Sequence, residues 1–160
     1  MKTKLAIGLL IFSLAGISCF ADTFTHQTAG MSIWFPDNWK ITTEGDMLEA
    51  IAPADDAYIQ LMALEDVKTM EQAVDIYTEE IDKIVKNFKP ISEGENIEIN
   101  GLNVFYIDGE GYVEKVLMDI SLSIIVTRKA MVMVIGFSER ASTEKYEKVF
   151  ENIISSMKAV

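Results

Sequence analysis

The chain has 160 residues and a formal net charge of −11, from 25 acidic and 14 basic residues. This acidic balance disfavours nucleic acid and anionic lipid as partners, because both repel a negative surface. The roughly 140 residues that follow position 21 are enough for one domain with its own core.

The first 21 residues have the pattern of a secretory signal peptide. Two lysines precede an uncharged run from Leu5 to Ile17, and small residues come before Asp22. The run is too short to cross a bilayer as a helix, which needs about 20 residues. We expect cleavage after Ala21 and export of residues 22–160 as a single domain, periplasmic or secreted, with no transmembrane span in the mature chain.

Cys19 is the only cysteine, so cleavage after Ala21 leaves no disulfide, no thiolate metal site and no cysteine nucleophile. The alternative is a lipoprotein signal cut before Cys19, whose thiol would then carry a lipid anchor in the outer membrane. Gly16 stands where such signals usually have leucine, which favours release over lipidation.

The first half of the mature chain predicts strands followed by one long helix. Strands are expected at 31–35, 40–44, 47–52 and 58–64, with turns rich in Pro, Asp and Gly between them. Thr69 and Gln72 form a capping box, and apolar residues then recur at steps of three and four as far as Phe88. A helix of roughly 20 residues is expected, because Pro90 forbids its continuation.

The second half predicts more strands and a closing helix. Strands are expected at 97–99, 102–108, 116–127 and 131–137, with turns at Asn100-Gly101 and at Gly109-Glu110-Gly111. The apolar run from Met131 to Ile135 predicts a strand covered on both faces. Ser142 is expected to cap a helix at 143–157. Together these elements predict an α+β fold, an antiparallel β-sheet covered by helices on both faces.

Four short motifs resemble the PsbP-like α/β/α sandwich family. They are Phe35-Pro36 followed by Trp39, the helix start Thr69 to Ala73, the Asn100-Gly101 hairpin, and the closing Ile153 to Lys158. Bacterial members are commonly small exported proteins or lipoproteins without an assigned role; better-known relatives are an extrinsic photosystem II subunit and an import factor that binds the GTPase Ran. The resemblance implies a docking fold with no catalytic motif to carry over, and the partners of those relatives do not transfer.

The two tryptophans receive different predictions. Trp39 follows the turn after Pro36 and is expected in the core. Trp34 alternates with Ile33 and Phe35, so it faces the other side of its strand. There it either packs under another segment or remains partly exposed as an anchor for a protein partner. Trp34 is the one candidate binding residue.

The sequence predicts no catalytic, metal or cofactor site. His26 is the only histidine and is expected at the surface, which leaves zinc sites and histidine-dependent triads unsupported. The acidic groups Asp55-Asp56, Glu65-Asp66 and Glu93 with Glu95 lack EF-hand spacing and are interpreted as solvated turns. Several methionines lie in predicted strands and are interpreted as core residues rather than a copper site: Met47, Met62, Met118, Met131 and Met133.

These features favour an exported, non-enzymatic binding or accessory protein of the bacterial cell envelope, whose partner is another envelope protein. The alternative is a small-ligand-binding protein or a hydrolase that uses a carboxylate or Ser, so enzymatic activity stays open. A polar pocket with converging carboxylates would favour the alternative. A filled core with an apolar groove would favour the binding protein.

Overall fold

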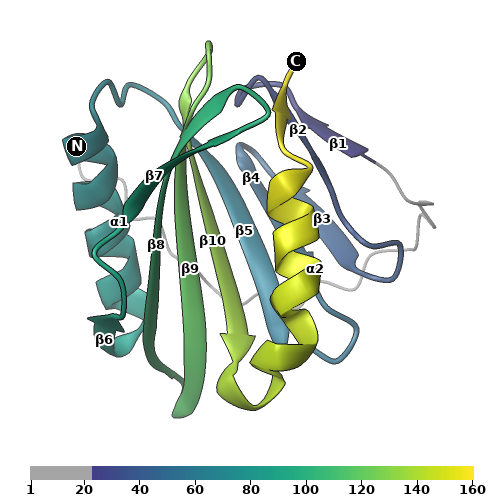
Figure 1. The fold of residues 1–160 in the computed structure, drawn as a ribbon, viewed down its shortest axis with the longest axis vertical. Coiled ribbons are helices and arrows are strands. Elements are labelled where there is room, and N and C mark those ends of the chain that lie inside the picture. Colours follow the sequence, from purple (N-terminus) through teal and green to yellow (C-terminus); the bar gives the residue numbers. More distant parts are fainter. Residues whose placement is uncertain (1–22) are drawn as a thin grey trace.

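A computed structural model describes residues 23–160, so the expected signal peptide, its cleavage site after Ala21 and Cys19 lie outside the described residues. The described chain forms an eight-stranded sheet, a three-stranded sheet and two α-helices (Figure 1). Every strand pair in these sheets is antiparallel, which confirms the predicted α+β class with an antiparallel sheet. Within this part of the chain, neither helix has the length and apolar character needed to span a membrane.

The large sheet has one continuous order, with a final strand attached to its side. The order is β3 (Lys40–Glu44), β4 (Met47–Ile51), β5 (Ala57–Leu64), β10 (Met131–Glu139), β9 (Val116–Val126), β8 (Leu102–Val113) and β6 (Lys86–Pro90); β7 (Glu95–Ile99) also pairs with β8.

The small sheet contains both ends of the described chain. It places β2 (Met31–Trp34) between β1 (Thr23–His26) and β11 (Lys158–Ala159). The helices are α1 (Met70–Ile84) and α2 (Thr143–Ser155), and a short 3-10 turn, η1 (Arg140–Ser142), leads into α2.

Strand β10 lies between two hydrophobic clusters, as its continuous apolar sequence predicts. Val132 and Val134 belong to one cluster, which also contains residues of α2 and β2. Met133, Ile135 and Phe137 belong to the other, which contains the buried residues of α1. Alternate residues of a strand point to opposite faces, so β10 is covered on both sides.

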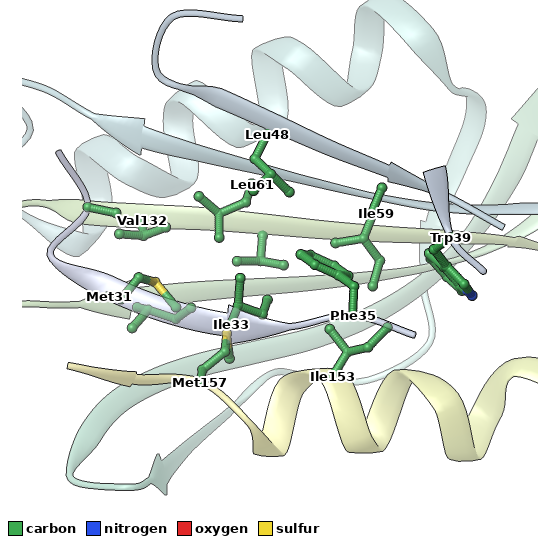
Figure 2. Close-up of a cluster of buried hydrophobic side chains, with 14 of the residues drawn as sticks. Met31, Ile33, Phe35, Trp39, Leu48, Ile59, Leu61, Val132, Ile153 and Met157 are labelled. Atoms are coloured by element: carbon green, nitrogen blue, oxygen red, sulfur yellow. The ribbon is translucent and has the colours of Figure 1, made fainter. Parts of the chain in front are cut away.

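The cluster on the α2 side has β2 at its centre. Ile33 and Phe35 lie between the large sheet and the C-terminal segment, with Ile59 on one side and Ile153 and Met157 on the other (Figure 2). This side of the large sheet is therefore covered by a helix together with a small sheet. The helix supplies only part of the apolar surface.

Helix α1 ends earlier than its apolar repeat predicts. Residues Lys86–Pro90 form β6 and pair with β8 instead of continuing the helix. Val85 and Phe88 still pack on the α1 cluster, but they do so over Gly111 and Gly109 of β8. A Cβ at Gly111 would lie 2.2 Å from Val85 Cγ1, so the missing side chain is what admits Val85. Residues 86–90 therefore pair with the edge of β8 instead of forming the last turn of the helix.

Two further local predictions are wrong. Gly109-Glu110-Gly111 lies inside β8 and makes no turn; the chain reverses at Glu114 and Lys115, whose φ angles are 48° and 75°. The two glycines let neighbouring side chains pack closely against β8, and they do not bend the chain. Ser142 makes no side-chain capping hydrogen bond to α2, because its hydroxyl donates to Asp56 instead.

The Asn100-Gly101 hairpin is confirmed, with φ angles of 49° and 80° that suit the tight turn between β7 and β8. Asn100 has a second contact that the hairpin pattern does not predict. Its side-chain amide donates to the carbonyl oxygens of Ser155 and Met157, each at 2.8 Å. The hairpin therefore binds the carbonyl of Ser155, which ends α2 and has no partner within the helix, and a second carbonyl just beyond the helix.

Candidate functional site

A groove of about 310 Å³ opens where the first turns of α2 meet the loops that follow β2 and β4. We call it the Trp39 groove. Two aromatic rings, two prolines and a few polar groups line it: Pro36, Asn38, Trp39, Pro53, Ala54, Lys145, Tyr146 and Val149. Its lining combines apolar surface with a small number of hydrogen-bonding groups, as ligand sites usually do.

Trp39 forms the boundary between the core and the groove. Its side chain is 7% exposed, which confirms the predicted core position. The ring packs edge-on against Tyr146 and Phe150, with centroid distances of 6.0 and 6.1 Å. The indole nitrogen points away from the hydrophobic cluster (Figure 2). The apolar part of Trp39 is therefore held by the core, while its N–H is the part left for a bound group.

Asp56 fixes the position of α2, which forms one wall of the Trp39 groove. Its carboxylate accepts hydrogen bonds from Tyr146 Oη at 2.5 Å and from Ser142 Oγ at 2.7 Å. Lys145 Nζ lies 3.5 Å from the same carboxylate and 4.5 Å from the centre of the Tyr146 ring. Three residues of the η1–α2 segment are thus anchored to one side chain of the loop between β4 and β5.

The electrostatics of this cluster keep Asp56 charged and Tyr146 neutral. Partial burial alone would raise the pKa of Asp56, but hydrogen bonds from Tyr146 and Ser142 outweigh it and hold the pKa below the ordinary value of 3.8. Burial, followed by the hydrogen bond to Asp56, raises the pKa of Tyr146. A carboxylate with a lowered pKa is a weak base, so this cluster positions Ser142 without activating it as a nucleophile.

Replacing Asp56 with Asn should destabilise the protein at neutral pH by about 1–3 kcal/mol, since Tyr146 and Ser142 lose a charged acceptor. The folded pKa of Asp56 lies below its ordinary value, so its contribution is complete above that value, 3.8, and is lost as the pH falls through the folded pKa. Urea titrations of wild type and Asp56→Asn at neutral and strongly acidic pH should show the difference shrinking in acid. An equal difference at both pH values would contradict this assignment.

Trp34, the candidate binding residue, lies outside the Trp39 groove. It is half-buried and packs against the same cluster as Ile33 and Phe35. Its backbone N–H donates to Ser156 Oγ at 2.8 Å. The structure therefore leaves part of Trp34 accessible, and the core holds the remainder.

His26 is half-buried in β1, so it lies only partly at the surface. Its Nε2 lies 3.1 Å from the carbonyl oxygen of Asp46, and its Nδ1 accepts the backbone N–H of Ala29 at 3.0 Å. Both ring nitrogens therefore have partners, one in the turn that follows β1 and one in the turn between β3 and β4. Among residues 23–160, no group of three His, Cys, Asp or Glu side chains gathers as a metal site.

Sequence reasoning missed most of the groove. The sequence places Tyr146 only within the helix expected at 143–157, and Asp56 only within a turn interpreted as solvated. Their hydrogen bond joins residues 90 positions apart, so no local pattern could reveal it. The only available signal was the concentration of turn-forming residues around Trp39 and Pro53.

Comparisons with known proteins show the fold. No protein-family model and no curated protein matches the sequence. Among solved structures, cyanobacterial PsbP (CyanoP) from Synechocystis sp. PCC 6803 matches 94% of this chain and 99% of its own, with a TM-score of 0.66 and 12% identity.

Two other solved structures match over most of their lengths. LpqN, which is involved in cell envelope biogenesis of Mycobacterium tuberculosis, covers 80% of this chain and 82% of its own, with a TM-score of 0.55 and 10% identity. A protein of unknown function from Pseudomonas aeruginosa, a putative regulator, covers 84% and 94%, with a TM-score of 0.52 and 16% identity. Sequence identities this low show similarity of fold alone. The chain therefore has a PsbP-like fold.

Proposed function

We propose that this chain is an exported, non-enzymatic binding or accessory protein of the bacterial cell envelope, built as an α/β/α sandwich. In this proposal the Trp39 groove holds an extended segment of another envelope protein. The observation that carries it is the lining of the groove, in which Trp39 and Tyr146 lie beside Pro36 and Pro53. Grooves with aromatic walls are the surfaces on which extended, proline-containing segments dock.

Hydrogen bonding and charge support the same occupant. The indole N–H of Trp39 and the side-chain amide of Asn38 are donors that suit the backbone carbonyls of an extended peptide. The net charge of −11 favours a partner whose surface is basic. LpqN, which shares this fold, supports an envelope role because it is involved in cell envelope biogenesis.

Trp34 provides a second candidate surface in the same proposal. A half-buried tryptophan combines a ring held by the core with an accessible edge, which is the arrangement of an interface anchor. The two candidate surfaces can be tested separately, because Trp34 does not line the Trp39 groove.

Affinity capture from an envelope fraction separates these surfaces. Ala54 is exposed at the edge of the groove, so Ala54→Arg should fill the groove without disturbing the core and should abolish capture of the partner that wild type retains. Ala159→Arg makes the same change at an exposed residue beyond the other end of α2 and should capture normally. Loss of capture by Trp34→Ala, with Ala54→Arg unaffected, would reject the groove and assign binding to Trp34.

A small molecule is the second candidate occupant, because about 310 Å³ lies at the lower limit of small-ligand pockets. A ligand that raises the melting temperature of wild type but not of Ala54→Arg would favour it. The hydrolase alternative has no such support, since Ser142 donates to a carboxylate of low basicity.

Export predicts a defined N-terminus. Mass spectrometry of protein recovered outside the cytoplasm should give a chain beginning at Asp22, because cleavage is expected after Ala21. The lipoprotein alternative predicts a chain beginning at Cys19 with the added mass of its acyl groups. Full-length protein that retains Met1 would contradict both.

A further inference from the structure

Three methionines stand side by side in one row of the large sheet. Met47 of β4 pairs with Met62 of β5, and Met62 pairs with Met133 of β10. Directly paired residues in an antiparallel sheet project from the same face, on strands about 4.8 Å apart. Met133 belongs to the cluster beneath α1, so all three thioethers lie on the face that this helix covers.

The three side chains line a cavity of about 30 Å³ between the sheet and α1. Its other walls are mostly isoleucine, with Gln60 and Glu80 as the polar members. This is enough room for a single ion or water molecule. A water would need two to four polar partners, which this lining supplies poorly.

One side chain that lines the cavity has a buried oxygen without a hydrogen-bond partner. Glu80 Oε1 forms an ion pair with Lys83 Nζ at 2.5 Å, but Glu80 Oε2 has no hydrogen-bond partner among the described residues. A buried acceptor left in this way costs about 1–3 kcal/mol, and more when it is charged. A cation in the cavity would satisfy it.

Thioether sulfur is a soft ligand that selects Cu(I), whereas calcium and magnesium require oxygen ligands. We propose that Met47, Met62 and Met133 bind one Cu(I) ion beneath α1, with Glu80 as the fourth, charge-balancing donor. This inference is independent of the Trp39 groove. The methionines are far apart in the sequence, and only the strand register brings them into one row.

Methionine methyl NMR tests the site directly, with Ag(I) as a redox-inert probe of Cu(I) binding. The protein is labelled at its methionine methyl groups and carries Cys19→Ser, so that its one thiol cannot bind the ion. The resonances of Met47, Met62 and Met133 should shift and saturate at one equivalent. The resonance of Met118, which is buried on the same side of the sheet outside the cavity, should not.

Leucine variants measure the affinity without opening a void, because leucine and methionine have similar volumes. In a competition with a coloured Cu(I) chelator, Met62→Leu should weaken binding by about tenfold or more, and the triple leucine variant should abolish it. Glu80→Gln should weaken binding, and Met118→Leu should match wild type. Unshifted methyl resonances, or equal affinity of wild type and Met62→Leu, would overturn the proposal.

Discussion

Replacing Trp39 with alanine should lower the free energy of unfolding by about 3–5 kcal/mol, the range for deleting a large core aromatic. Trp39 is 7% exposed and packs edge-on against Tyr146 and Phe150, so its removal leaves a void that two rings of α2 line. Chemical denaturation followed by circular dichroism measures the loss. The same substitution should also displace Tyr146 and weaken the hydrogen bond to Asp56.

Trp34→Ala is the matched control, because it deletes the same side chain from a half-buried position. Its loss should be clearly smaller than that of Trp39→Ala. A loss below about 1 kcal/mol for Trp39→Ala would mean that its ring contributes little to the core. That result would also remove the physical basis for a rigid indole donor in the groove.

Gly111→Ala should destabilise the protein by about 1–3 kcal/mol, the usual cost of overpacking a core. The added Cβ would lie 2.2 Å from Val85 Cγ1 and 3.3 Å from Phe88 Cα, which belongs to the backbone of β6. The side chain of Val85 can change rotamer, but it is buried and has little free space. The β6–β8 edge should therefore separate or shift.

A double-mutant cycle with Val85→Ala tests this explanation, because that change removes the methyl group that the new Cβ would meet. Val85→Ala alone should also destabilise, since it leaves a void in the α1 cluster. The double variant should lose less stability than the two single losses combined. Additive losses would show that Val85 is not what Gly111 accommodates.

Local patterns predicted most of the fold, for reasons that the structure makes clear. The capping box of Thr69 and Gln72 and the hairpin at Asn100-Gly101 depend on a few neighbouring residues, and both are present. The apolar run from Met131 requires only that both faces of its strand are buried, and both faces of β10 are buried. Each of these signals is complete within a short segment of sequence.

The predictions failed where a distant segment decided the local structure. The apolar spacing up to Phe88 fits a helix, but the edge of β8 offered hydrogen bonds to Lys86–Pro90. A pair of glycines fits a turn, but Gly109 and Gly111 make room for the side chains of Phe88 in β6 and Val85 just before it. Ser142 fits a helix cap, but Asp56 provides a charged acceptor.

The candidate sites were the least predictable part of the molecule. The Trp39 groove joins two loops and a helix, and its central hydrogen bond spans 90 positions. The methionine row requires the register of three strands, which residue spacing does not reveal. In both places the residues of the candidate site come together only in the tertiary structure. A short stretch of sequence therefore contains only some of them.

The small sheet also sets the order in which the protein is completed during synthesis. The segment from Met31 to Phe35 supplies Met31, Ile33 and Phe35 to the core, yet β11, which pairs with β2, and the covering residue Met157 are made much later than this segment. The backbone N–H of Val160 donates to the carbonyl oxygen of Gly30. The hydrophobic cluster on the α2 side therefore closes only after the ribosome has made the segment from Met157 to Ala159, and until then its apolar side chains remain accessible to chaperones and proteases.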